Sequence, residues 1–126
     1  MTLRPDIDIN GINEALVLKA DTDFGNIPNN VKYIVESWQS GTSWYRIWND
    51  GWIEQSGRGT FSSQLEEEKT LLKPFSNTNY NLILTNLGHQ HNVYGYPRTT
   101  STFLMGMATP NVSWGIGNFS WYACGY

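Results

Sequence analysis

Residues 43–57 read SWYRIWNDGWIEQSG, with aromatic and β-branched runs on either side of Asn49-Asp50-Gly51. A turn of this type between such runs is the strongest short-range indication of a β-hairpin. A two-residue loop would place Ile47 opposite Glu54. A three-residue loop, with its glycine in a left-handed bulge, places Arg46 opposite Glu54 and the two flanking tryptophans opposite each other. We favour the second register, because aromatic and opposite-charge pairs each add about 0.2–1 kcal/mol.

Both faces of this hairpin carry apolar side chains. In the favoured register the tryptophans lie on one face, and Ile47 and Ile53 lie on the other. A hairpin with one solvated face would show polar residues along that face. We therefore expect a second sheet to cover one face and a neighbouring copy of the chain to meet part of the other.

The remaining sequence after residue 30 is also typical of β-structure. Residues 117–124 alternate, with Phe119, Trp121 and Ala123 on one side. Residues 65–72 (LEEEKTLL) have helical propensity, but their short length and the following proline favour a strand. Short strands separated by Gly and Asn turns predict an all-β fold, an antiparallel β-sandwich. The expected strands are residues 31–38, 43–48, 52–56, 65–72, 80–85, 102–107 and 117–124.

Residues 1–30 differ from the rest of the chain. They contain no Trp or Tyr and one Phe, and residues 13–20 could form at most two helical turns. Such a segment cannot bury enough apolar surface against itself and needs the main domain or other copies of the chain. We place the boundary near residue 30. Residues 1–30 are then an irregular or helical stalk or linker segment, and residues 31–126 are the sandwich domain.

The composition excludes several classes of protein. Of the 126 residues, 15% are charged, against about 25% in typical domains, and there are six Trp, seven Tyr and five Phe. The net charge of −3, without a Lys/Arg cluster, argues against nucleic-acid binding. No apolar run approaches the ~18 residues of a membrane-spanning helix. We expect most tryptophans and Cys124 to be buried, and Glu66–Glu68 to form a solvated face.

No catalytic motif stands out. The G-x-S-x-G elbow and the Gly-rich phosphate loop are absent from the sequence. Two carboxylates could meet in a cleft and hydrolyse a sugar, but the sequence favours no particular pair. We therefore do not expect an enzyme.

Residues 88–98 read GHQHNVYGYPR and allow three interpretations. The first is a polar loop with two exposed histidines. The second is a metal site, since His89 and His91 would share one face of a strand, and three chains around an axis would supply six imidazoles. The third is a sugar-binding surface.

Sugar binding would use aromatic rings beside polar side chains. The rings of Tyr94 and Tyr96 could stack on the apolar faces of sugars, while Arg98 and the two histidines donate to hydroxyl groups. The same reasoning applies to Trp114, which lies in the Gly-rich residues 111–117, because an exposed tryptophan in a loop is costly unless it packs or binds.

Four segments resemble bacteriophage tail-fibre tip domains. Residues 43–57 resemble that family's hairpin, in which an S-W-Y-R strand leads through a D-G turn into W-[IV]-E-Q-G-G, with Ser56 here in place of a glycine. Residues 73–80 (KPFSNTNY) resemble its P-F-x-x-T-N-Y connection, and residues 120–126 (SWYACGY) its W-x-A-x-G-Y terminus. Residues 18–27 (LKADTDFGNI) resemble the stalk segment that often precedes such tips.

This resemblance implies a homotrimeric knob at the far end of a virion tail fibre, trimerised in part by residues 1–30 and acting outside the cell. Its expected partner is a bacterial surface glycan or outer-surface protein, with no membrane insertion. No cofactor is expected, apart from the axial metal ion that the histidines could hold. The contact residues are expected in the part outside the shared framework: His89, His91, Tyr94, Tyr96, Arg98 and Trp114.

The sequence leaves two alternatives open. One is a small glycan-degrading enzyme, which would need a cleft with two acids or a nucleophile and a base. The other is a purely structural knob that caps the fibre and aligns the three chains.

Overall fold

The computed structural model describes residues 31–62, 65–88, 92–108 and 117–126, of which Tyr33–Tyr126 belong to one compact unit. Eight strands and no helix occur among the described residues. No described helix could therefore cross a membrane. The strands are β1 (Ile34–Ser40), β2 (Ser43–Trp48), β3 (Ile53–Phe61), β4 (Glu67–Thr70), β5 (Asn81–Leu87), β6 (Asn92–Pro97), β7 (Thr102–Ala108) and β8 (Gly117–Gly125).

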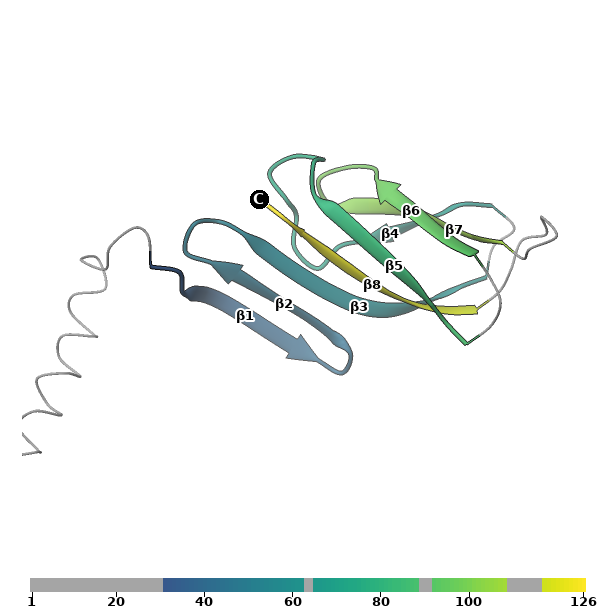
Figure 1. Cartoon of the computed structure of the whole chain (residues 1–126), viewed down its shortest axis with the longest axis horizontal. Helices are drawn as coiled ribbons and strands as arrows, with labels where there is room; N and C mark the ends of the chain where they lie inside the picture. Colours follow the sequence, from purple (N-terminus) through teal and green to yellow (C-terminus); the bar gives the residue numbers. More distant parts are fainter. Residues whose placement is uncertain (1–30, 63–64, 89–91, 109–116) are drawn as a thin grey trace, which may run out of the picture. The chain divides into compact units, whose positions relative to one another are not determined.

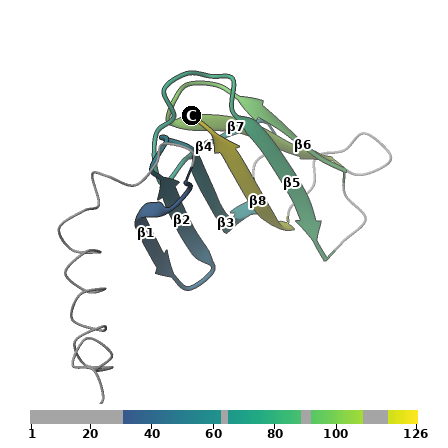
Figure 2. The ribbon, with the colours of Figure 1, turned by 60° about the vertical axis from the view of Figure 1, so that its left-hand side comes forward.

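The strands form two antiparallel sheets that pack face to face (Figures 1 and 2). The larger sheet has the order β1-β2-β3-β8-β5, and the smaller has the order β4-β7-β6. The smaller sheet covers the β3-β8-β5 side of the larger one, while β1 and β2 extend beyond it (Figure 1). The predicted antiparallel sandwich is confirmed.

The hairpin has the favoured register. Arg46 pairs with Glu54 and Ile47 with Ile53. The Trp48 N–H donates to the Trp52 carbonyl at 2.8 Å. Gly51 has a φ of 91°, in the left-handed region that favours glycine. The three-residue loop is therefore confirmed.

Residues 65–72 contain a strand rather than a helix, but β4 is only four residues long. β6 was not predicted from the sequence, because glycine and proline at positions 95 and 97 have low strand propensity. The glycine is required by packing. A Cβ at Gly95 would lie 2.8 Å from the Leu104 carbonyl and would overlap the Leu84 side chain.

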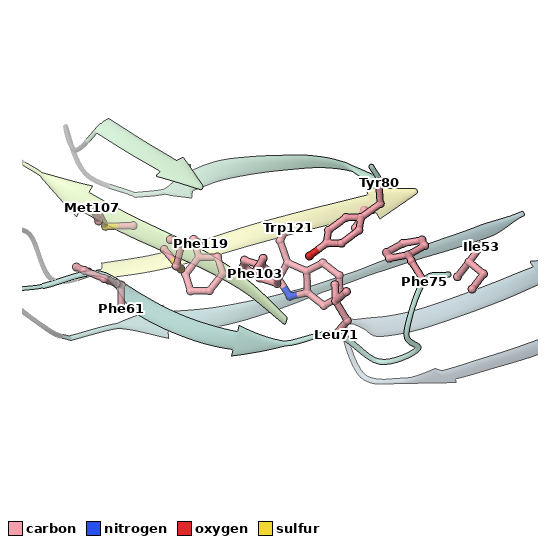
Figure 3. Packing of buried hydrophobic residues seen from close by; sticks show 11 residues of the cluster. Ile53, Phe61, Leu71, Phe75, Tyr80, Phe103, Met107, Phe119 and Trp121 are labelled. Carbon is pink, nitrogen blue, oxygen red and sulfur yellow. The ribbon is translucent and has the colours of Figure 1, made fainter. Parts of the chain in front are cut away.

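The core lies between the two sheets and is built mainly from aromatic and methionine side chains (Figure 3). The predicted alternation in β8 is confirmed, since Phe119, Trp121 and Ala123 are all buried. The expectation for the tryptophans is wrong for the described residues, because only Trp121 of their five is buried. Three of the other four lie on β1 and β2, outside the cover of the smaller sheet, and Trp52 lies at the turn that follows.

Cys124 was expected to be buried but is only partly buried. It lies on the outer face of β8, whereas its neighbour Ala123 points into the core.

Gln55 is a polar side chain that is fully buried on β3. Its amide donates to the Lys73 carbonyl at 2.7 Å, and its oxygen accepts the N–H groups of Leu72 and Lys73 at 2.8 and 3.0 Å. Gln55 therefore fixes the segment that follows β4 against the larger sheet.

Candidate functional site

Two exposed tyrosines lie side by side on the outer face of the smaller sheet. Tyr94 and Tyr96 are 41% and 44% exposed and alternate along β6 with partly buried neighbours. Across the strand pair, Tyr94 lies opposite Gly106 and Tyr96 lies opposite Leu104. Both rings therefore belong to one surface, on the side of the sheet that faces away from the core.

Glycine at position 106 lets the first ring approach the sheet closely. A Cβ at Gly106 would overlap the Tyr94 ring and would lie 2.5 Å from its hydroxyl oxygen. No side chain fits in that space, so the ring lies directly over the β7 backbone. This arrangement limits the movement of Tyr94 and leaves one side of the ring open to solvent.

One carboxylate accepts hydrogen bonds from both tyrosines. The Tyr94 hydroxyl donates to Glu66 Oε1 at 3.1 Å, and the Tyr96 hydroxyl donates to Glu66 Oε2 at 2.9 Å. These bonds cross from β6 over β7 to the residue just before β4. We call the two rings together with this carboxylate the tyrosine platform.

The electrostatics keep both phenols protonated as donors. Burial and the Glu66 carboxylate raise the pKa of Tyr94. The hydrogen bond to Glu66, followed by burial and the charge of Glu66, raises the pKa of Tyr96, whereas the charge of Arg98 opposes the rise. Arg98 lies at the end of the platform, where its Nε contacts Glu68 Oε2 at 2.8 Å. The platform and the Arg98–Glu68 pair beside it thus combine aromatic rings, carboxylate acceptors and a guanidinium donor.

The structure brings together three of the six predicted contact residues, namely Tyr94, Tyr96 and Arg98. The other three, His89, His91 and Trp114, lie outside the described residues, and so does the predicted metal site. Among the described residues, no three His, Cys, Asp or Glu side chains gather where they could hold a metal ion.

Sequence reasoning missed Glu66. The residue is exposed, as was expected for the glutamate run, but it also holds the platform together. Its neighbours in the run have partners too: Glu67 contacts Lys69 at 2.6 Å, and Glu68 contacts Arg98. The only available signal was the two-residue spacing of the tyrosines, which predicts a shared face once β6 is recognised as a strand.

A second aromatic cluster lies on the face of the larger sheet that the smaller sheet does not cover. The Arg46 guanidinium lies 5.3 Å from the Trp44 ring and 5.9 Å from the Trp48 ring, and its Nε donates to Glu54. Glu54 also accepts hydrogen bonds from the Trp48 indole at 3.0 Å and from the Tyr122 hydroxyl at 3.2 Å.

This network shifts the pKa values of its members. Burial tends to raise the pKa of Glu54, but the hydrogen bonds from Trp48, Arg46 and Tyr122 and the charge of Arg46 together lower it. Burial and the neighbouring Glu54 and Cys124 raise the pKa of Tyr122 to about 12. The network therefore favours an ionised Glu54 and a neutral Tyr122.

The opposite face of β1 and β2 carries a shelf of stacked rings. The Trp38 and Tyr45 rings stack with centroids 5.9 Å apart and an interplanar angle of 19°. Lys73 Nζ lies 4.9 Å from the centre of the Tyr45 ring and 3.2 Å from Glu36 Oε2. A shallow hollow of about 320 Å³ is lined by Trp38, Tyr45, Leu72 and Lys73. We call β1 and β2 the aromatic ribbon, because both of its faces carry exposed or half-exposed rings.

The two-layer sandwich is the architecture of solved tail-fibre ends. The C-terminal part of the R2 pyocin fibre of P. aeruginosa superimposes with a TM-score of 0.57 and 21% identity over 73% of this chain and 26% of that one. An N-truncated R2-type pyocin tail fibre gives a TM-score of 0.58 and 17% identity over 95% and 43% of the two chains. At these identities the likeness concerns the fold, and the chain spans less than half of either fibre.

Residues 46–126 match the family described as putative tail fiber protein gp53-like, C-terminal, so the chain belongs to that family. None of the curated proteins matches the chain. Family membership confirms the tail-fibre tip domain predicted from residues 43–57, 73–80 and 120–126. The protein is thus a component of a phage-like tail.

Proposed function

We propose that this domain is the receptor-binding end of a tail fibre, which attaches the particle to a glycan or protein on the bacterial surface. The tyrosine platform carries the proposal: two exposed rings are held by one carboxylate beside Arg98, in a tail-fibre domain. Tyrosines offer large amphipathic contact area at a low cost in conformational entropy. The activity is binding without catalysis, and it takes place outside the cell.

The remaining predicted contact residues extend this proposal. His89 and His91 immediately precede β6 in the chain, and Trp114 lies in the connection before β8. We include all three in the proposed contact surface. A metal ion held by the two histidines of each of three chains stays a prediction, which metal analysis of the purified protein would test.

We further propose that the domain works as a homotrimer whose copies meet along the aromatic ribbon. β1 is the edge strand of the larger sheet and is exposed along its whole length, with Val35 57% and Trp38 44% exposed. Long apolar edge strands are normally covered, because they otherwise pair with other chains. Three copies on one fibre would raise the effective concentration of weak sites, so avidity would exceed single-site affinity.

The receptor-binding proposal is tested with fluorescently labelled protein and a panel of bacterial strains. We expect the wild-type chain to bind at least one strain and the double variant Tyr94→Ala, Tyr96→Ala to lose at least tenfold in apparent affinity. Ile83→Ala is the matched control, because Ile83 is an exposed apolar residue on β5. Unchanged binding by a folded double variant would overturn the proposal, as would shortening of the surface polysaccharide, which would indicate an enzyme.

The trimer is tested separately by light scattering. We expect three copies for the wild-type chain and a smaller species for Trp38→Glu, which places a charge on the exposed shelf. Ile83→Glu places the same charge on β5 and should leave the mass of the assembly unchanged. A wild-type monomer at high concentration contradicts the trimer but leaves single-site binding intact.

A further inference from the structure

We propose that Glu66 is a positioning residue that makes the tyrosine platform select uncharged sugars over acidic ones. The inference rests on the proposed receptor-binding function and names the class of ligand that the platform takes. It follows from three features of the platform: how the rings are held, which hydrogen-bonding groups remain, and which charges surround them.

The rings are held in place before any ligand arrives. Each Glu66 oxygen accepts one tyrosine hydroxyl, and the glycine at position 106 leaves room for the Tyr94 ring against β7. Hydrogen bonds to a carboxylate are stronger than those between neutral groups. A surface that is already ordered loses less conformational entropy when a ligand binds, so its affinity is higher. Glu66 therefore contributes to binding through the two tyrosines.

The platform also keeps hydrogen-bonding capacity for sugar hydroxyls. An ionised carboxylate has about four acceptor positions, and the two tyrosines use two of those on Glu66. Arg98 contacts Glu68 through its Nε, and a guanidinium has further N–H groups that could donate to a ligand. A sugar stacked on the rings would meet acceptors on one side and donors on the other.

The charges around the rings disfavour an anionic ligand. Glu66 and Glu68 contribute two negative charges and Arg98 one positive charge, and the positive charge is already paired with Glu68. No ion pair among the described residues involves Glu66. A sugar carboxylate stacked on the tyrosines would therefore lie beside an uncompensated negative charge, whereas an uncharged sugar would gain the same stacking and hydrogen bonds without that repulsion.

The test uses the surface polysaccharide of a strain that the wild-type chain binds, separated by anion exchange into a neutral and an acidic fraction. Each fraction competes against cell binding at pH 8 and low salt. We expect the neutral fraction to inhibit at about one tenth of the sugar concentration that the acidic fraction requires. High salt should narrow this ratio by screening the repulsion, without weakening inhibition by the neutral fraction.

Glu66→Gln removes the charge while keeping the size and one acceptor oxygen of the side chain. We expect binding of the neutral fraction to fall severalfold and the ratio between the fractions to narrow. In alkaline ultraviolet titration, the phenols of Tyr94 and Tyr96 should ionise at lower pH than in the wild type. Arg58→Gln, which removes an exposed charge on β3 away from both the platform and the aromatic ribbon, should change none of these results.

The outcomes separate this inference from the proposed function. Binding to no strain overturns the receptor-binding function and the inference together. Binding to cells with equal inhibition by both fractions, or stronger inhibition by the acidic one, overturns the inference alone. A Glu66→Gln variant with wild-type affinity and an unchanged phenol titration also overturns it.

Discussion

Two of the aromatic surfaces of this domain, the Glu54 cluster and the tyrosine platform, are each built around one glutamate. On the larger sheet, Glu54 accepts hydrogen bonds from an arginine, a tryptophan and a tyrosine, and its side chain is only 17% exposed. On the smaller sheet, Glu66 accepts hydrogen bonds from the hydroxyls of Tyr94 and Tyr96, which are both more than 40% exposed. Glu54, mostly covered and compensated by a cation, joins strands of the sheet, whereas the exposed Glu66 orients the two rings that we propose bind a ligand.

The largest effect on stability is expected from removing Glu54, and removing Glu66 gives the comparison. Glu54→Ala leaves Arg46 without its anion and two aromatic donors without an acceptor. We therefore expect the free energy of unfolding to fall by about 2–4 kcal/mol. Glu66→Ala should lower stability by less than about 1 kcal/mol, because exposed phenols can turn to water. Urea denaturation followed by tryptophan fluorescence measures both changes. Equal losses would show that the two surfaces do not differ in the way described.

The next largest effect on stability is expected at Gly106, which lies beneath the Tyr94 ring. Gly106→Ala places a methyl group where the Tyr94 ring lies, and we expect it to cost about 1–3 kcal/mol of stability through overpacking. Cell binding should fall as well, because the ring is displaced. The double variant Gly106→Ala, Tyr94→Ala is the control, since it removes the clash and should recover most of the stability without recovering the binding. Failure to recover stability would place the strain elsewhere.

The stability contributed by the Glu54 network should depend on pH at both the acid and the alkaline end of the range. The lowered pKa of Glu54 means that its contribution is complete above the ordinary value of 4.5 and is lost as the pH falls through the folded-state value. The raised pKa of Tyr122 acts oppositely: its contribution is complete below 10 and is lost as the pH rises towards 12. Urea midpoints across the pH range measure both losses, and Tyr122→Phe should remove the alkaline one. Identical alkaline curves for the variant and the wild type would contradict this assignment.

The sequence predicted the hairpin surface far better than the platform, and the reason is sequence separation. Arg46 and Glu54 are eight residues apart around one turn, so strand alternation and turn length alone pair them. Glu66 and its tyrosines are 28 and 30 residues apart and meet only because β4 and β6 both pair with β7. Nothing local encodes that sheet order. The exposure of the tryptophans was also missed, because it depends on which face of the larger sheet the smaller sheet covers, for Trp44 and Trp48, and on how far it reaches, for Trp38.

The smallest effect on stability is expected at the end of the platform. Arg98 and Glu68 form an exposed pair, with side chains 53% and 50% exposed, and such pairs contribute less than about 1 kcal/mol. Arg98→Ala should therefore leave the urea midpoint almost unchanged while weakening cell binding severalfold, because a ligand loses its donor. Arg58→Ala is the matched control, since Arg58 is an exposed arginine on β3 of the other sheet and should change neither measurement. A loss of stability without a loss of binding would instead assign Arg98 to holding β4, because its partner Glu68 lies on that strand.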